Sequence, residues 1–497
     1  MNRAAPSRRA WTAFAWVGMC AFFLVAVWYV WRIGDPMPTA DNWINLDVFL
    51  RKAYYHGVGI SDFLWNRGAG DHSQPLDKAL LWANARYFGL DFRLEGLFAM
   101  LLGLAAMLVL RRAALDGGEG DARWGSIGVV AIAAVFFSLN SSRIYSYSMI
   151  TLWFSLYLGM FLSVLAAWKA MNGVSPAWLL AITFVFGVIA DDVAYLAAAS
   201  IALSLCLYGG RVGGWRRTAQ VIGYCLAGFL LSRLFYLCFQ GKVGGSIQLR
   251  TSPGGFLRFL ASDYRDIWQW WAIPSASGLA QVDTMKLLVG ERAAPWVGGG
   301  LAIVMLPMHM WFWWKAWARK PDLTGFMAVC VMLFYYAHVA GILYGRIPVF
   351  GTDYLNSLRY VSFYQLGVIA LLLMLTAAAG DAARNGSRVR WAYAAPLVAV
   401  IMLQVAVAKI AFAQAHWIME YQENKAYTLA TMAIFTPEAR QECMAFKELR
   451  NICASEERRE KLGGLLVDNH LSVFSPQFQR RYPRLAVAAA KAGKHDR

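Results

Sequence analysis

The sequence predicts an all-α polytopic membrane protein with about eleven transmembrane helices. Of its 497 residues, 59% are apolar or aromatic and 15% are charged, whereas soluble domains carry about 25% charged residues. The mean hydropathy is +0.42, and the apolar residues gather in runs of about 20, the length that crosses a bilayer as a helix. These observations exclude an ordinary soluble enzyme and a disordered chain.

The predicted spans follow one another along the chain with two long interruptions. They lie near residues 11–31, 94–110, 124–139, 150–167, 177–190, 193–209, 218–238, 296–314, 322–343, 360–379 and 392–415. Each is expected to be helical, because a helix satisfies its own backbone hydrogen bonds in lipid. The first is predicted to be a retained anchor, since its apolar run is too long for a signal peptide and no small-residue cleavage site follows it.

Lysine and arginine are distributed unequally between alternate loops. With the N-terminus inside, the inside segments hold sixteen of these residues, and the short outside loops hold three, namely Arg143, Arg346 and Arg359. Basic residues in short loops mark the cytoplasmic side, so the bias predicts a cytoplasmic N-terminus and an outside C-terminus. Much of the net charge of +17 is then a topology signal, and nucleic acid is not an expected partner.

Three longer stretches fall outside in this topology: residues 32–93, 239–295 and 416–497. We divide the chain into a transmembrane domain, 1–415, and an outside C-terminal segment, 416–497, with helical patterns. In the first loop, apolar residues at helical spacing over 43–55 and 77–88 predict short interfacial helices at the membrane surface. Within the C-terminal segment, residues 471–474 are expected to form a strand or a docking segment.

Two of the seven cysteines, Cys443 and Cys453, lie ten positions apart in the C-terminal segment. An oxidising compartment outside the membrane favours a disulfide between them. Metal binding is the alternative, but no CxxC or His–Cys spacing supports it.

Polar residues of the first outside loop suit chemistry at the membrane surface. Asp41 follows the first span, where a carboxylate can take a proton from an acceptor hydroxyl. Asp is equally a favoured N-cap, here for the helix expected to begin near Trp43. Asp71 and His72 could orient an acceptor, bind a divalent cation or form a turn, and a single Asp–His pair is a weak metal signal. The sequence thus leaves open whether the protein binds a divalent metal, and it indicates no other cofactor.

A leaving phosphate needs cations, and four arginines are candidates: Arg143, Arg233, Arg250 and Arg359. Arg233 lies inside a predicted span, where an arginine is costly and marks a functional site, although snorkelling to the interface also accommodates it. Asp191 and Asp192 stand at the outer junction of two spans. They either bind a metal or sugar hydroxyls, or form a solvated tip that caps the next helix.

Three short patterns accompany this arrangement: Asp41-Asn42-Trp43 after the first span, Asp71-His72 before the second, and Asn356-Ser357-Leu358-Arg359-Tyr360 before a late span. With them the chain resembles the GT-C superfamily of integral-membrane glycosyltransferases, although bacterial members often have Glu in place of Asp71. The resemblance implies a polyprenyl-phosphate sugar as donor, a catalytic carboxylate in the first outside loop, and substrate contacts from Asp71, His72, Arg359 and Tyr360. It also implies a place in the bacterial inner (plasma) membrane.

The expected activity is transfer of a hexosyl or pentosyl group, on the outer face, to an exported glycan or glycolipid such as a polysaccharide or lipopolysaccharide of the cell envelope. Asp41 is the expected base, and Arg359 with Arg233 or Arg250 is expected to hold the phosphate. A lipid or glycan transporter (flippase) is the first alternative, but it predicts discontinuous helices and polar sites at the midplane. A glycan ligase and a non-catalytic assembly subunit are the others.

Overall fold

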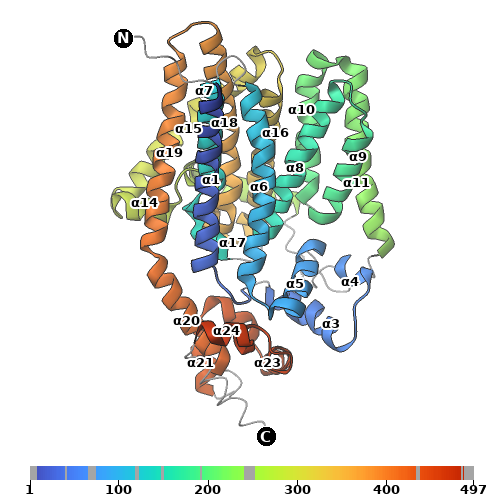
Figure 1. Ribbon diagram of the computed structural model, residues 1–497, viewed down its shortest axis with the longest axis vertical. Helices are drawn as coiled ribbons and strands as arrows, with labels where there is room; N and C mark the ends of the chain where they lie inside the picture. Colours follow the sequence, from blue (N-terminus) through green and yellow to red (C-terminus); the bar gives the residue numbers. More distant parts are fainter. Residues whose placement is uncertain are drawn as a thin grey trace.

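The computed structural model describes residues 8–39, 42–64, 74–117, 122–146, 150–190, 193–239, 252–431, 437–482 and 485. Over these residues the chain is helical and has no strand, so the all-α class is confirmed. The long helices stand side by side in an upright bundle, and shorter helices gather at the end of the bundle where α1 ends (Figure 1).

Apolar helices form the bundle, and they coincide with the eleven predicted spans. They are α1 (Arg8–Ile33), α6 (Phe92–Gly117), α7 (Ala122–Phe136), α8 (Ile150–Met171), α9 (Ala177–Ala190), α10 (Val193–Val212), α11 (Gly214–Phe239), α15 (Ala294–Ala318), α16 (Leu323–Gly345), α18 (Val361–Arg384) and α19 (Arg390–Ala413). In the described part of the chain, nine are long and apolar enough to cross a membrane, and α7 and α9 are shorter. The chain is therefore a multi-pass membrane protein.

Helix α18 is the centre of the bundle. In its most apolar stretch of 18 residues, 89% of the stretch is buried, whereas the corresponding share is 22% for α15 and for α19. Helix α18 packs against α6, α7, α16 and α19. Helices α7 and α18 approach each other so closely at Gly128 of α7 that a side chain there would collide with Thr376 of α18. Such close packing of small residues holds spans together in lipid, where no hydrophobic force acts between helices.

The first loop and the C-terminal segment fold together, and we call residues 34–91 with 415–482 the loop–tail domain. Its loop elements are α2 (Asn42–Asn45), the π-helical η1 (Leu46–Leu50), α3 (Arg51–Tyr55), α4 (Ile60–Leu64) and α5 (Pro75–Phe88). Its tail elements are α20 (Ala415–Thr431), α21 (Pro437–Ala445), η6 (Lys447–Leu449), α22 (Arg450–Cys453), α23 (Glu456–Asp468), η7 (Ser472–Phe474) and α24 (Pro476–Arg481). Both parts contribute to one apolar core. In addition, Trp43 Nε1 donates to the Glu448 carbonyl at 2.9 Å.

The remaining short elements belong to connections between spans at the end where α1 ends, which we call the loop–tail end, although α14 itself lies on the flank of the bundle against α15 and α19 (Figure 1). They are η2 (Leu139–Ser146), α12 (Pro253–Ser262), η3 (Tyr264–Asp266), α13 (Ile267–Ser277), α14 (Val282–Val289), α17 (Ile347–Phe350), η4 (Thr352–Asn356) and η5 (Leu358–Tyr360). Because the spans alternate in direction, the turns before α8 and before α18 come to lie beside the end of α1, and η2 packs against both α1 and α6.

Candidate functional site

Several predicted site residues lie outside the described residues: Asp41, Asp71, His72, Asp191, Asp192 and Arg250. For Arg143 the structure describes the backbone, which belongs to η2, and not the side chain. Arg233, Arg359 and Tyr360 are described in full. The described residues at the loop–tail end define two polar centres, one acidic and one basic.

The acidic centre lies where α5 meets the first turn of α6. Asp77 and Glu95 are buried, at 7% and 3% exposure, and their side chains interact electrostatically. Asn45 Nδ2 donates to Asp77 Oδ2 at 3.2 Å, and Asn84 Nδ2 donates to Glu95 Oε1 at 3.0 Å. Burying two carboxylates side by side costs free energy, so this pair is a functional candidate.

Ion pairs hold the elements around the acidic centre. Lys425 of α20 pairs with Asp35, which ties the tail to the end of α1; burial raises the pKa of the Asp35 carboxyl, and Lys425 opposes that shift. Lys52 pairs with Asp62 at 2.5 Å. Burial alone would raise the pKa of Asp62, but hydrogen bonds from Lys52 and from the Gly59 amide outweigh it, and the pKa is lowered.

An apolar groove with a volume of about 510 Å³ lies beside the acidic centre, between α1, α5 and α6. Helix α1 contributes Phe23 and Val27 to its walls, and α6 contributes Leu97 among others. Asn84 and Glu95 are its polar lining residues. The groove therefore leads along two spans to a buried carboxylate.

The basic centre lies on the turns that precede α18. The Arg359 guanidinium lies 5.1 Å from the ring centre of Tyr354 and 5.4 Å from that of Tyr360. Its Nε is buried and has no hydrogen-bond partner among the described residues. Arg346, which follows α16, also interacts electrostatically with the Tyr360 side chain. The Arg359 guanidinium, with the charge of Arg346 acting on the same tyrosine, makes this a positively charged site suited to an anion, because arginine matches phosphate oxygens in geometry and charge.

The turn η2, which carries Arg143, connects the two centres. It packs against η5 on one side and against α6 on the other. At the start of the helix that follows it, Thr151 Oγ1 donates to the Glu95 carbonyl at 3.3 Å. The acidic and the basic centres thus lie on elements that both contact η2.

Asn140 fixes the position of η2. Its Nδ2 donates to the backbone carbonyl of Ser277 at 2.8 Å, and its Oδ1 accepts from the backbone N–H of Gln281 at 2.7 Å. Both partners belong to the second long loop, so this loop holds the turn in place. Next to Asn140, Ser138 Oγ bonds to Gln404 Oε1 of α19.

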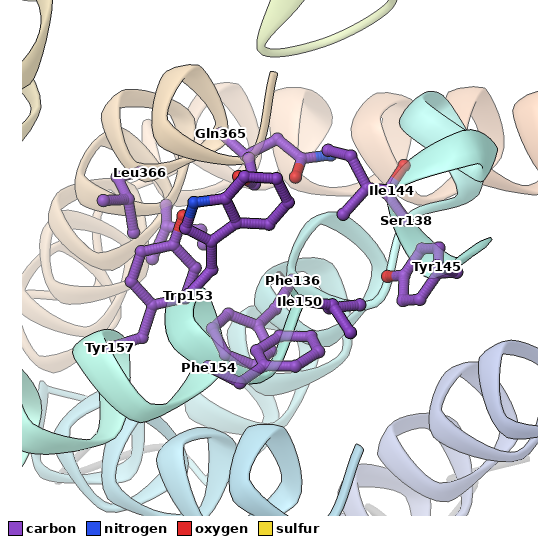
Figure 2. A pocket seen from close by; sticks show the side chains of 12 residues that line it. Phe136, Ser138, Ile144, Tyr145, Ile150, Trp153, Phe154, Tyr157, Gln365 and Leu366 are labelled. Atoms are coloured by element: carbon purple, nitrogen blue, oxygen red, sulfur yellow. The ribbon is translucent and has the colours of Figure 1, made fainter. Parts of the chain in front are cut away.

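Beneath η2 lies a small cavity, shown in Figure 2, where side chains of α8 and α18 face one another. Its volume is about 20 Å³, which is room for one water molecule and not for a sugar. Gln365 Nε2 is buried at its edge and, within the described part of the chain, has no hydrogen-bond partner. The cavity is therefore too small to be a substrate pocket.

Arg233 lies on another flank of the bundle. Its guanidinium lies 4.5 Å from the ring centre of Tyr195 and 5.6 Å from that of Tyr236. Helix α11 packs against α8, α9, α10 and α4, whereas η5 packs against η2 and α18. Arg233 therefore packs on elements other than those that carry Arg359.

Cys443 and Cys453 are joined by a disulfide, with their Cα atoms 6.2 Å apart, and both are buried in the core of the loop–tail domain. Over the described ranges, no group of three or more His, Cys, Asp and Glu side chains could hold a metal ion. Asp191 and Asp192, the residues considered for a metal, lie outside those ranges.

Sequence reasoning missed Asp77, Glu95 and Arg346 as site residues. Glu95 stands in the first turn of an apolar span, and a charge in such a run is the same signal that singled out Arg233. Asp77 is hidden within an amphipathic helix, where an acidic residue in the first turn is ordinary. Arg346 entered the sequence analysis only as one of the basic residues of the short outside loops that indicate the topology.

Comparison with known proteins finds no match to this chain among family models, curated proteins or solved structures. The chemistry of the two centres is therefore assigned from their residues and contacts.

Proposed function

We propose that the chain is a membrane glycosyltransferase that moves a sugar from a polyprenyl-phosphate donor to an exported glycan or glycolipid. The observation that carries this proposal is the placement of an acidic and a basic centre at one end of the bundle, on elements that both contact η2. Displacement of a phosphate from a sugar requires a base for the acceptor and cations for the leaving group. The basic centre offers the cations, and the first loop, which contributes Asp77 to the acidic centre, also carries Asp41, the carboxylate that we assign as the base.

In the proposed reaction the acceptor hydroxyl oxygen attacks the anomeric carbon. The bond from that carbon to the phosphate oxygen breaks, polyprenyl phosphate leaves with the electron pair, and the acceptor proton passes to a carboxylate. We assign this base to Asp41, whose neighbours Thr39 and Asn42 are buried in the loop–tail domain. Arg359 and Arg346 balance the charge on the leaving phosphate, and a single displacement inverts the anomeric centre.

We further propose that the protein lies in the bacterial inner membrane, with both centres on the periplasmic side. The excess of basic loop residues at the other end of the bundle supports this orientation. At that end, Arg319 pairs with Asp322 at 2.7 Å and with Asp381 at 3.1 Å. The disulfide of the loop–tail domain suits an oxidising compartment.

The test is complementation of a strain that lacks this chain, with exported glycans read by mass spectrometry. Deletion is expected to remove one sugar, and the wild-type chain to restore it. Asp41→Asn is expected to lower its incorporation by about 100-fold or more, the usual contribution of a general base. Arg359→Gln is expected to have a comparable effect through the loss of charge on the leaving phosphate.

Two matched variants control for charge loss as such. Glu460→Gln removes an exposed carboxylate of the same domain, and Arg388→Gln removes an exposed guanidinium between α18 and α19; both should restore the glycan fully at equal membrane levels. Full restoration by Asp41→Asn would refute the assignment of the base. Unchanged glycans after deletion would favour the transport and scaffold alternatives over the transferase.

A further inference from the structure

The second long loop holds the turn that leads to the basic centre. Helix α13 of this loop packs against η4, the 3-10 turn that begins at Thr352. Thr352 Oγ1 donates to Asp266 Oδ2 at 2.8 Å and accepts from Trp270 Nε1 at 3.2 Å. A hydroxyl can donate one hydrogen bond and accept others, so this one side chain joins a carboxylate and an indole of the second loop to η4.

Both partners of Thr352 belong to a packed part of the second loop. Asp266 ends η3 and immediately precedes α13. The Trp270 side chain is buried, and its ring stacks on that of Phe259 of α12 with the ring centres 5.3 Å apart. The next residue, Trp271, donates from Nε1 to the Ala302 carbonyl of the span α15 at 3.2 Å. The hydrogen bonds of Thr352 therefore tie η4 to a part of the loop that is itself anchored on the bundle.

The other end of η4 is tied to α18, and Tyr354 stands between the two tied ends. The Tyr364 hydroxyl of α18 donates to the Leu355 carbonyl at 3.0 Å. The Tyr354 ring stacks on that of Phe350, with the ring centres 4.6 Å apart, and its centre lies 5.1 Å from the Arg359 guanidinium. Tyr354 is thus the side chain through which the place of η4 affects the place of Arg359.

We propose that Asp266, Trp270 and Thr352 are positioning residues of the basic centre. They fix η4 so that the Tyr354 ring holds the Arg359 guanidinium in place before an anion arrives. An arginine that is already ordered binds an anion more tightly, because less side-chain entropy is lost on binding. The inference rests on the proposed function where it takes this anion to be a lipid phosphate, whereas the ordering of Arg359 is independent of the reaction.

The first test measures the ordering of Arg359 without any ligand. The full chain in phosphatidylcholine nanodiscs is treated with phenylglyoxal, which modifies arginine side chains, and mass spectrometry follows the rate at Arg359. Thr352→Val removes the hydroxyl but keeps the size of the side chain. Modification of Arg359 is expected to become about fivefold faster, the factor for loss of one hydrogen-bonding group. Arg233, which stacks on two tyrosines on another flank, serves as the internal reference and should react at an unchanged rate.

Three further variants show which group of the network is responsible. Thr352→Ser keeps the hydroxyl and should keep the wild-type rate at Arg359. Trp270→Phe removes the indole N–H but keeps an aromatic ring, so it should accelerate the modification less than Thr352→Val does. Thr12→Val is the matched control at the other end of the bundle, where the hydroxyl donates to the Arg8 carbonyl of its own helix, and it should have no effect. Gel filtration confirms that each variant is folded.

A double-mutant cycle tests whether the network acts through Tyr354. Tyr354→Leu removes the ring and should by itself accelerate modification of Arg359. Adding Thr352→Val to Tyr354→Leu should then give no further acceleration, because two residues that act through one contact are not additive. Full additivity of the two effects would contradict the route through this ring.

The second test adds farnesyl phosphate as the anionic probe. It should slow modification of Arg359 in the wild-type chain, and Thr352→Val should need about 2- to 10-fold more of it for the same protection, the factor for ordering one side chain. Absence of protection in the wild type would count against the proposed donor and not against the positioning. An unchanged rate at Arg359 in Thr352→Val, or an equal acceleration at Arg233, would overturn the positioning role itself.

Discussion

Lys425 is a fully buried lysine, and its ammonium group pairs with the buried Asp35 carboxylate. Lys425→Met removes the cation and leaves the carboxylate unpaired, which is expected to cost about 3–5 kcal/mol of unfolding free energy. This loss is measured by heating the full chain in detergent and detecting unfolding of the tail through its cleavage by a protease. The double variant Asp35→Leu with Lys425→Met removes both charges and should recover most of the stability. Equal loss in the single and double variants would contradict the prediction.

Single residues differ in how far the sequence reveals them. Arg359 and Tyr360 could be singled out because they belong to a short pattern before a span, and both now lie in the basic centre. The contribution of Arg346 could not be predicted, since it stands thirteen positions before Arg359 and its charge acts on Tyr360 only because of the turns α17, η4 and η5. The pairing of Lys425 with Asp35 joins positions 390 apart, which no local pattern encodes.

At the scale of an element, the position of η2 depends on Asn140 and its partners in the second long loop. Asn140→Ala removes the hydrogen bonds to Ser277 and Gln281 and leaves two buried backbone groups without a partner, which costs about 1–3 kcal/mol. Hydrogen exchange of residues 139–146 and 277–284 should accelerate by about 5- to 150-fold, the factor that corresponds to this free energy. Asn172→Ala, which breaks an exposed hydrogen bond to Trp168, should leave the exchange of residues 139–146 and 277–284 unchanged. If Asn140→Ala also left it unchanged, the role given to Asn140 would be refuted.

The bundle helices could be predicted because length and apolarity alone decide a span. Short elements were less accessible. The single interfacial helix expected over 43–55 contains the π-helical segment η1 between α2 and α3, and residues expected to form a strand or docking segment near 471–474 form the 3-10 turn η7. In that turn the Ser472 amide donates to the Gly89 carbonyl at 2.7 Å, so a tertiary contact with the first loop sets the conformation.

For the whole molecule, the two largest apolar cores of the described residues lie one in the bundle and one in the loop–tail domain. The disulfide lies in the second core. Cys443→Ala together with Cys453→Ala should therefore lower the stability of the loop–tail domain by about 2–3 kcal/mol, the expected value for a loop of this length. Limited proteolysis should show earlier cleavage in α20–α24, with the bundle helices as resistant as in wild type. Equal resistance of the tail in both forms would contradict this.

At this scale the sequence predicts the number and order of spans but not their neighbours. Alternation of charged loops supports one orientation, yet nothing along the chain indicates that α18 is the central helix or that α1 and α6 enclose a groove with α5. Contacts of this kind arise from packing between distant segments. For the same reason the sequence does not predict the acidic centre, and of the basic centre it singles out only Arg359 and Tyr360.

The closing of the loop–tail domain by its last segment has a consequence for biogenesis. The first loop leaves the ribosome early, but Trp43 and Asp35 meet their partners Glu448 and Lys425 only after the last span has been inserted. Domains of a growing chain otherwise tend to fold in the order of synthesis. A nascent chain that stops before α20 would thus present an uncovered apolar first loop to membrane proteases and chaperones, which makes completion of the tail a checkpoint for the quality of the whole chain.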